Sequence, residues 1–326
     1  MKIKNQRSTE LISVQQTASL LREAQKILIV THIRPDGDTA GSACALCLGL
    51  RALGKSAYLA ANPPSMRRYE KYMTPYFAPA DFLPEYVVAV DIASGGQFPP
   101  GGEAFAGQTD LAIDHHGTNS GYAAYTLLDD HAAAAGELVY LVLGELGVPV
   151  TAEIAEALYV ALATDTGGFR TAGTTGRTLT IAGALHDVGF DVFGLNRRLF
   201  ETRSGARLRL ESYLFGSMRM PEPGVCVMVL PCGVIRSCGA GEDDMDKLST
   251  ITMTPEGVRT GLLLRQLPAG DWKISLRTDG SVHAGRVLRR VGGGGHPDAA
   301  GAVMSGEPAQ IEAAILAALK QEEQKP

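Results

Sequence analysis

The chain has 326 residues, of which 45% are hydrophobic and 20% are charged, and this composition predicts a soluble globular protein with enough apolar residues for two domains. The formal net charge of −5 argues against a protein that coats nucleic acid, although it leaves room for a local basic groove. No apolar stretch approaches the length of a membrane span, and residues 1–6 lack the apolar core of a signal peptide, so we expect no membrane partner and a cytoplasmic location.

Apolar strand patterns and amphipathic helix patterns alternate through the first half of the chain. Strand 26–31 is continuously apolar, which is typical of a parallel strand buried on both faces. The other predicted strands are 57–60, 86–91, 111–114 and 125–128, and the predicted helices are 12–25, 39–52, 132–146, 151–164 and 174–190. Segment 62–84 is rich in proline and aromatic residues and is expected to be irregular with one short helix. This alternation predicts an α/β fold with an open, doubly wound parallel sheet.

The pattern changes after residue 190. Segment 196–219 is predicted to be helical and is rich in arginine, a composition that is more often a solvated helix face than a nucleic-acid track. Predicted strands 225–230, 259–267 and 272–277 then accompany predicted helices 243–251 and 308–321. We therefore expect a catalytic domain over 1–190, a helical linker over 191–220, and a smaller α/β domain with a mixed sheet over 221–326, with a cleft between the two domains.

The five cysteines predict neither a disulfide framework nor a zinc site. Cys44 and Cys47 lie inside an apolar helical pattern, where they are expected to be buried small residues. The remaining three, at positions 226, 232 and 238, are spaced too loosely for a zinc knuckle.

Acidic and histidine side chains gather where the predicted strands and helices of the first domain end. They are His32, Asp36, Asp38, Asp91, Asp114, His115, His116 and Asp165. Because the carboxyl ends of parallel strands meet at one edge of a sheet, most of these side chains are expected to converge there. Asp38 should also face the N-terminus of helix 39–52, whose dipole favours a carboxylate.

Each of these residues also has an ordinary structural interpretation. Asp-Gly pairs are common in turns, an aspartate after a strand often caps a helix, and adjacent histidines can pair at a domain interface. Taken together, the clusters favour a metal site, because bare anions brought together repel one another unless a cation compensates them. A ligand set of mostly carboxylate with some imidazole favours Mn²⁺ or Mg²⁺ over structural zinc. Two such ions, about 3.5–4 Å apart, suit in-line displacement at phosphorus.

A second motif lies in the smaller domain. Consecutive glycines at Gly293, Gly294 and Gly295 expose backbone amides that can cradle a phosphate, Arg277 offers a bidentate guanidinium, and His296 can donate a further hydrogen bond. The alternative is a flexible turn beside a buried arginine.

Together, these motifs make the chain resemble the DHH phosphoesterase superfamily. The resemblance rests on segment 32–38, Asp91, segment 114–116 and Asp165 in the first domain, and on segments 274–277 and 292–301 in the second. Within that superfamily it resembles the bifunctional oligoribonucleases, or nano-RNases, which also act as 3′-phosphoadenosine 5′-phosphate phosphatases. One departure is Gln97, which stands where related chains often carry an arginine.

The resemblance implies a role for each candidate residue. His32 and Asp36 would hold a first divalent ion, and Asp38, His115 and Asp165 would hold a second. Asp91 would bridge the two, and the nucleophile would be a metal-bridging hydroxide. His116 would contact the phosphate and assist the leaving oxygen, and Asp114 would orient its neighbours rather than bind metal.

The expected function is hydrolysis of very short single-stranded RNA to 5′-mononucleotides and of 3′-phosphoadenosine 5′-phosphate to AMP. Alternatives are a phosphodiesterase for cyclic di-AMP or its linear dinucleotide, a RecJ-like DNA exonuclease and a family II pyrophosphatase. A non-catalytic nucleotide-binding module belongs to a different class, and a lost ligand would be its signature. The sequence leaves open the order of substrate preference and whether the chain forms a homodimer.

Overall fold

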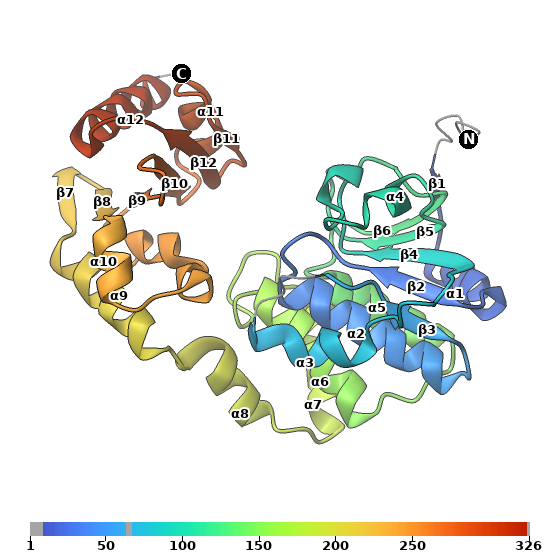
Figure 1. Cartoon of the computed structure of the whole chain (residues 1–326). Helices are drawn as coiled ribbons and strands as arrows, with labels where there is room; N and C mark the ends of the chain where they lie inside the picture. The colour runs from blue at the N-terminus through green and yellow to red at the C-terminus, as the bar shows by residue number, and fades with distance from the viewer. Residues whose placement is uncertain (1–8, 63–66, 325–326) are drawn as a thin grey trace. The chain divides into compact units, whose positions relative to one another are not determined.

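The protein is described by a computed structural model that covers residues 9–62 and 67–324. The chain divides into two compact units, one up to Thr202 and one from Arg203 onward, and each is described by itself (Figure 1).

The first unit is built on a six-stranded sheet in which every pair of neighbouring strands is parallel. The strand order is β1-β6-β5-β4-β2-β3. The bounds are β1 (Glu10–Leu11), β2 (Ile27–Val30), β3 (Ala57–Leu59), β4 (Tyr86–Val90), β5 (Leu111–Asp114) and β6 (Tyr125–Leu128). This confirms the α/β fold with a parallel sheet, and β1 is an edge strand too short for the sequence pattern to reveal.

Among the described residues of this unit, four helices lie between these strands in the chain, and four more follow β6. They are α1 (Val14–Glu23), α2 (Gly37–Ala52), α3 (Glu70–Met73), α4 (Glu103–Ala106), α5 (Ala135–Glu145), α6 (Ala152–Asp165), α7 (Gly176–Asp187) and α8 (Val192–Asn196). Figure 1 shows α2 and α5 on one face of the sheet of β2 and β4. The irregular segment predicted from 62 contains α3 and two 3-10 turns, Arg67–Tyr69 and Thr74–Tyr76, and residues 63–66 of it lie outside the described residues.

The sheet has a core on each face because successive side chains of a strand point to opposite sides. In β2, Ile27 and Ile29 join the large core that also contains Leu46 of α2 and Leu158 of α6. Leu28, which lies between them, joins a smaller core on the other face. Burial on both faces explains the continuously apolar pattern of the predicted strand 26–31.

Cys44 and Cys47 are buried in α2 as predicted, and all five cysteines are free. Burial is the main reason that the pKa of the Cys47 thiol is raised to about 11, which keeps it protonated. These thiols therefore behave as small core side chains.

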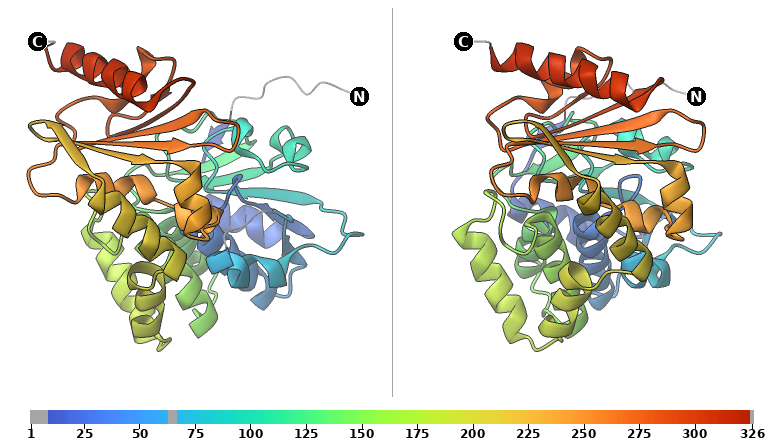
Figure 2. Two further views of the ribbon diagram at one scale, coloured as in Figure 1. Left: turned by 60° about the vertical axis from the view of Figure 1, so that its left-hand side comes forward. Right: turned by 90° about the vertical axis from the view of Figure 1, so that its left-hand side faces the viewer.

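The second unit has a six-stranded mixed sheet, as predicted, in the order β11-β12-β10-β9-β8-β7. Only β8 and β9 pair in parallel. The strands are β7 (Arg219–Glu222), β8 (Val225–Leu230), β9 (Thr260–Gln266), β10 (Trp272–Thr278), β11 (Gly294–Gly295) and β12 (Ala299–Met304). The helices are α9 (Gly205–Gly216), α10 (Cys232–Ser237), α11 (Ala284–Arg289) and α12 (Pro308–Glu323). Figure 2 shows α12 across one face of this sheet, where it closes a core with α11, while α9 closes a second core on the other face.

Two helix predictions after residue 190 are wrong in detail. The expected helix 243–251 is instead two 3-10 turns, Glu242–Met245 and Leu248–Met253, because Lys247 between them has a left-handed φ of 48°. The expected helix 196–219 is broken at Thr202, which is extended, and it resumes at α9 after Ser204 caps that helix.

The basic residues of that stretch are largely engaged within the protein. Arg207 is buried and donates to Glu211 at 2.6 Å and to two backbone carbonyls. Arg219 lies in β7 rather than in a helix, and both of its terminal nitrogens donate to Glu312. These contacts support a structural role for the arginines rather than a nucleic-acid track. Among the described residues, no helix combines the length and the hydropathy that crossing a bilayer requires.

Candidate metal centre

The loop between β2 and α2 carries the first group of candidate ligands. Asp36 caps α2, its side chain accepting hydrogen bonds from the amides of Asp38 and Thr39. Its Oδ1 lies 3.7 Å from Nε2 of His32. The hydroxyl of Thr39 donates to the Val90 carbonyl at 2.9 Å, which ties the start of α2 to the end of β4. The start of α2 and the candidate ligand Asp36 that caps it are therefore held next to β4, which ends at Val90 just before Asp91.

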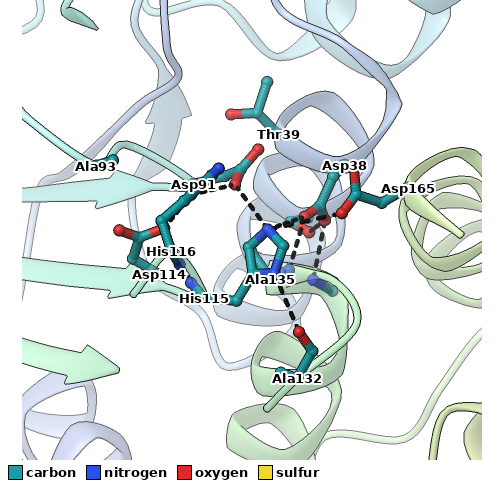
Figure 3. Close-up of polar contacts among 12 residues, drawn as sticks. Asp38, Thr39, Asp91, Ala93, Asp114, His115, His116, Ala132, Ala135 and Asp165 are labelled. Atoms are coloured by element: carbon teal, nitrogen blue, oxygen red, sulfur yellow. Dashed lines mark hydrogen bonds and ion pairs between the residues drawn. The ribbon is translucent and has the colours of Figure 1, made fainter. Parts of the chain in front are cut away.

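Asp91 lies at the centre of the cluster. One carboxylate oxygen, Oδ2, is 3.6 Å from Nε2 of His32, and the other, Oδ1, is 3.5 Å from Nε2 of His115 and 3.5 Å from Nδ1 of His116. Figure 3 shows its carboxylate facing the two histidines. The side chain is 3% exposed, and Oδ1 has no hydrogen-bond partner among the described residues. A buried carboxylate oxygen without a donor is an unusual and costly arrangement unless a cation occupies the space that it faces.

A second group gathers on the other side of Asp91. Nε2 of His115 lies 3.6 Å from Oδ2 of Asp38 and 3.7 Å from Oδ2 of Asp165. Asp165 is the last residue of α6, and the chain then turns away through Gly167, Gly168 and Phe169, all three with positive φ. The structure thus brings together the six residues predicted as ligands. Their possible metal-holding groups are His32, Asp36 and Asp91; Asp38, His115 and Asp165; and a third that joins His116 to Asp91 and His115.

The spacing of these atoms fits ligation better than direct hydrogen bonding. The nitrogen-to-oxygen distances of 3.5–3.7 Å exceed a normal hydrogen bond. Ligand atoms that each lie about 2.0–2.2 Å from a shared ion are separated from one another by roughly 3–3.5 Å. The carboxylate and imidazole atoms are therefore spaced as if around a shared divalent cation, and they are too far apart to be explained by hydrogen bonds to one another.

The electrostatics of the cluster point in the same direction. Burial, followed by the charges of Asp38 and Asp36, raises the pKa of Asp91 well above its usual range. Burial and then the charge of Asp165 raise the pKa of Asp38 to about 7, with His115 acting in the opposite sense. Several carboxylates share one buried space, and a bound cation would reverse these shifts by favouring the charged forms.

His116 lies close to Asp91, but its shortest polar contact is with a carboxylate that is not a predicted ligand. Its Nδ1 is 2.8 Å from Oδ1 of Asp114, a fully buried carboxylate that also accepts from the side chain of Asn119. The bond with Asp114 is the largest cause of the raised pKa of His116. The imidazole is 42% exposed, so its free edge faces accessible space. Asp114 orients His116 in this arrangement, as expected.

Several supporting residues were not found from the sequence. Asp38 accepts hydrogen bonds from the amides of Ala135 and Gly136 and from the hydroxyl of Ser42. Its carboxylate therefore faces the N-terminus of α5, in addition to lying in the first turn of α2. The sequence predicted the position at the start of α2 but not the contact with α5. Figure 3 shows Ala135 beside Asp38. The contact joins residues nearly a hundred positions apart, and no sequence spacing reveals it.

Gln97 and Asn62 hold the loops around the centre. The side-chain oxygen of Gln97 accepts from the amides of Ala93 and Ser94, so this oxygen braces the loop after Asp91. The side chain of Asn62 donates to the carbonyl of His32 at 2.8 Å. These two amides fix the backbone beside two of the predicted ligands.

The candidate substrate residues all lie in the second unit. Arg277 is half-buried on β10, its pKa lowered by burial, with Asp298 acting in the opposite sense. His296 is exposed, and its amide donates to the Ala299 carbonyl. The amide of Gly293 donates to the Leu288 carbonyl at 2.8 Å. The amide of Gly293 is therefore not free to form the predicted cradle.

The glycines are needed there for another reason. A Cβ at Gly293 would lie 2.5 Å from the Gly301 carbonyl oxygen, and a Cβ at Gly295 would lie 2.5 Å from the Ala299 carbonyl oxygen. Gly294 and Gly295 form β11, which pairs with β12 in this close approach. The run therefore packs two backbone segments together.

Two family patterns match the chain, one in each unit. The pattern of the N-terminal domain of the DHH family matches residues 26–162, and that of the DHHA1 domain matches residues 225–325. A bifunctional oligoribonuclease and PAP phosphatase NrnA of Thermus thermophilus is 35% identical over 298 residues, which cover 91% of this chain and 90% of that protein. The chain belongs to the DHH family. A bifunctional oligoribonuclease and PAP phosphatase NrnA of Bacillus subtilis is 26% identical to this DHH-family chain, covering 85% of the chain and 88% of the relative.

Solved structures agree on the fold. An exopolyphosphatase-related protein from Bacteroides fragilis superposes with a TM-score of 0.83 at 22% identity, covering 95% of this chain and 96% of that one. The exonuclease RecJ of Thermus thermophilus, solved in complex with Mn²⁺, gives a TM-score of 0.56 at 16% identity, covering 98% of this chain and 56% of RecJ. The DHH-family assignment and the observed architecture are therefore consistent.

Proposed function

We propose that this DHH-family protein hydrolyses short oligoribonucleotides to 5′-mononucleotides and 3′-phosphoadenosine 5′-phosphate to AMP. The protein is a hydrolase that acts on phosphodiester and phosphate bonds. The substrate proposal is supported chiefly by the Thermus thermophilus relative, named a bifunctional oligoribonuclease and PAP phosphatase, which matches 91% of the chain at 35% identity. The cluster around Asp91 supplies the chemistry that such a reaction needs.

Two divalent ions are part of this proposal, and Mn²⁺ is favoured with Mg²⁺ as the alternative. His32 and Asp36 would hold one ion, Asp38, His115 and Asp165 the other, and Asp91 both, since its two oxygens face the two groups. Two such ions supply an activated water and neutralise the charge that develops on the phosphoryl oxygens. The unpartnered Oδ1 of Asp91 is the observation that most favours a cation here.

The protein's own groups then carry out the remaining tasks. Because Nδ1 of His116 is engaged with Asp114, Nε2 is the atom left for the substrate. The hydrogen bond from His116 to Asp114 favours the protonated imidazole. We propose that Nε2 donates that proton to the leaving oxygen, a role typically worth roughly 10²–10⁴-fold in rate.

The second unit is proposed to recognise the nucleotide. Arg277 would contact a phosphate that is not being cleaved, and exposed His296 would add a hydrogen bond. The glycine run Gly293, Gly294 and Gly295 would allow β11 and β12 to pack closely beside the phosphate that Arg277 binds.

A substrate panel with Mn²⁺ tests the proposed function. It comprises dinucleotides, five-mers, longer RNA and DNA, 3′-phosphoadenosine 5′-phosphate, cyclic di-AMP and pyrophosphate. We expect the dinucleotides, five-mers and 3′-phosphoadenosine 5′-phosphate to be cleaved best. Preferential cleavage of long DNA, of cyclic di-AMP or of pyrophosphate would replace the proposal with the corresponding alternative.

A further inference from the structure

One fully buried carboxylate lies beside the proposed metal centre without belonging to it. Glu137, in the first turn of α5, is 0% exposed. Its Oε1 accepts from the Thr178 hydroxyl at 2.5 Å and from the Ala133 amide at 3.2 Å, and its Oε2 accepts from Nε of Arg177 at 2.7 Å. A buried carboxylate is stable only when it is paired and hydrogen-bonded, and Thr178, Ala133 and Arg177 supply those contacts to Glu137.

Arg177 extends this arrangement to a second carboxylate. Its NH2 group donates to Oδ2 of Asp129 at 2.8 Å while its Nε remains on Glu137. Asp129 follows directly after β6, and Arg177 lies in the first turn of α7. One guanidinium thus joins the start of loop 129–134 to the start of α5, which follows that loop. Glu137 also binds the loop itself through the Ala133 amide.

The segment held in this way supplies three contacts to the proposed ligands. The Ala132 carbonyl lies 3.1 Å from Nδ1 of His115, which directs Nε2 of that ring into the cluster. The Ala135 amide donates to Oδ2 of Asp38 at 2.7 Å, and the Gly136 amide donates to Oδ1 at 3.0 Å. Figure 3 shows Ala132 and Ala135 next to His115. Ala132, Ala135 and Gly136 have no polar side chain that could hold their backbone in position, so other residues must do so.

We propose that Glu137 and Arg177 are positioning residues, which clamp loop 129–134 and the first turn of α5 so that the backbone of this segment orients His115 and Asp38 for metal binding. The inference rests on the proposed function, because it takes those two residues as ligands. Groups that orient metal ligands typically contribute about 10- to 100-fold to metal affinity. A ligand that is free to rotate must be ordered when the ion binds, and the clamp removes that cost in advance.

The central test replaces Arg177 and measures two quantities. Arg177→Met should weaken Mn²⁺ binding, measured by titration calorimetry, by roughly 10- to 100-fold. In the metal-free protein it should speed hydrogen exchange at the amides of Ala133, Ala135 and Gly136. Arg198→Met is the matched control, since Arg198 is an exposed arginine of the same unit whose ion pairs are with Glu156 and Asp191, outside the loop. The control should leave both quantities unchanged.

Two further variants separate positioning from general stability. Arg177→Lys keeps the charge and should retain much of the Mn²⁺ affinity. Glu137→Gln combined with Arg177→Met removes the uncompensated buried charge, so it should recover thermal stability without recovering the affinity, because the link to Asp129 stays broken. An Arg177→Met protein with faster loop exchange but wild-type Mn²⁺ affinity would overturn the inference, and so would unchanged exchange.

The outcome for the wild type distinguishes the two proposals. If the wild-type protein bound no Mn²⁺, the proposed function would fail, and the exchange data would still decide whether Glu137 and Arg177 clamp the loop. If the wild type bound Mn²⁺ and cleaved the expected nucleotides while Arg177→Met matched it throughout, only the clamp would fail.

Discussion

Asp91 combines three properties that are unfavourable in a folded protein without a ligand. It is a buried carboxylate, one of its oxygens has no hydrogen-bond partner among the described residues, and its backbone has a left-handed φ of 60°. Left-handed conformations are uncommon for residues other than glycine, and strain of this kind tends to persist at functional sites. Folding alone gives no reason to keep such a residue, whereas a shared metal ligand gives one.

Replacing Asp91 should therefore separate stability from activity. Asn keeps the shape and tolerates left-handed backbone, so Asp91→Asn should leave the metal-free protein at least as stable as the wild type by urea unfolding, because a buried charge is removed. Asp91→Ala removes the side chain and should be less stable than Asp91→Asn by about 1 kcal/mol. Both variants should lose turnover and at least one bound ion by calorimetry. Two tightly bound ions and a near-normal rate in either variant would contradict the bridging role.

His116 calls for a different outcome, since it lies beside the cluster and is held by Asp114. His116→Ala should lower kcat by roughly 10²–10⁴-fold while the protein still binds both ions, because the substitution removes a proton donor and not a ligand. Loss of an ion from this variant would place His116 among the ligands and undo the assignment.

At the scale of elements, the centre depends on how closely α2 and α6 approach each other. A Cβ added at Gly37 would lie 2.2 Å from the hydroxyl oxygen of Thr164, and one added at Gly41 would lie 2.3 Å from the carbonyl oxygen of Ala157. Gly37 stands between Asp36 and Asp38, so the approach of the two helices also sets the positions of these carboxylates relative to Asp165 at the end of α6.

Gly37→Ala should consequently disturb both packing and metal binding. We expect a loss of about 1–3 kcal/mol in the free energy of unfolding, as for other overpacked contacts, together with weaker Mn²⁺ binding. Gly144→Ala is the matched control: Gly144 lies in α5, where a Cβ would meet no described atom outside its own helix within 4 Å, so its substitution should stabilise the helix by up to about 1 kcal/mol. A Gly37→Ala protein as stable as the wild type would show that the two helices can separate freely.

At the scale of the whole molecule, the proposed function divides between two units, since the proposed ligands all lie before Thr202 and the candidate nucleotide contacts all lie after Arg203. The DHH and DHHA1 matches fall on either side of the same boundary. This division predicts that metal binding and nucleotide recognition can be impaired separately.

Arg277→Ala tests recognition. It should raise KM for short oligonucleotides and for 3′-phosphoadenosine 5′-phosphate and lower kcat/KM by about 30- to 1000-fold, equivalent to about 2–4 kcal/mol for a charged contact. Mn²⁺ affinity and hydrolysis of bis-p-nitrophenyl phosphate, a small ester, should change little. Lys273→Ala on the same strand is the control. Equal losses on the small ester and on the nucleotides would mean that Arg277 supports the fold.

Adding and removing the metal tests the proposed metal binding by the first unit. Mn²⁺ at about 100 times its Kd should stabilise the native protein by about 2.7 kcal/mol for each ion bound, and chelation should reverse this. Hydrogen exchange should show the added protection in the loops that carry His32, Asp91, His115 and Asp165, and not in the sheet of β8, β9 and β10. Protection confined to residues after 203 would place the binding site elsewhere.

The sequence by itself determined the parts of this protein that depend on local pattern. Continuous apolar runs identified β2, β4 and β5, since burial on both faces leaves no polar position in such a strand. The same strands made it possible to expect His32, Asp91 and His115 at one edge, because parallel strands end together. The short edge strand β1 and the 3-10 turns after Gly241 had no such pattern. The strand was not predicted, and the turns were predicted as one helix.

Only the tertiary structure decided what holds those residues in place. The Ala135 amide reaches Asp38, the Ala132 carbonyl reaches His115, and Arg177 joins Glu137 to Asp129. It also decided that Gln97 braces its own loop and that the amides of Gly293 and His296 are already used. These contacts are made by backbone groups or by side chains distant in sequence. Periodicity indicates which residues are buried, but the partner of a buried polar group is set by how the chain packs.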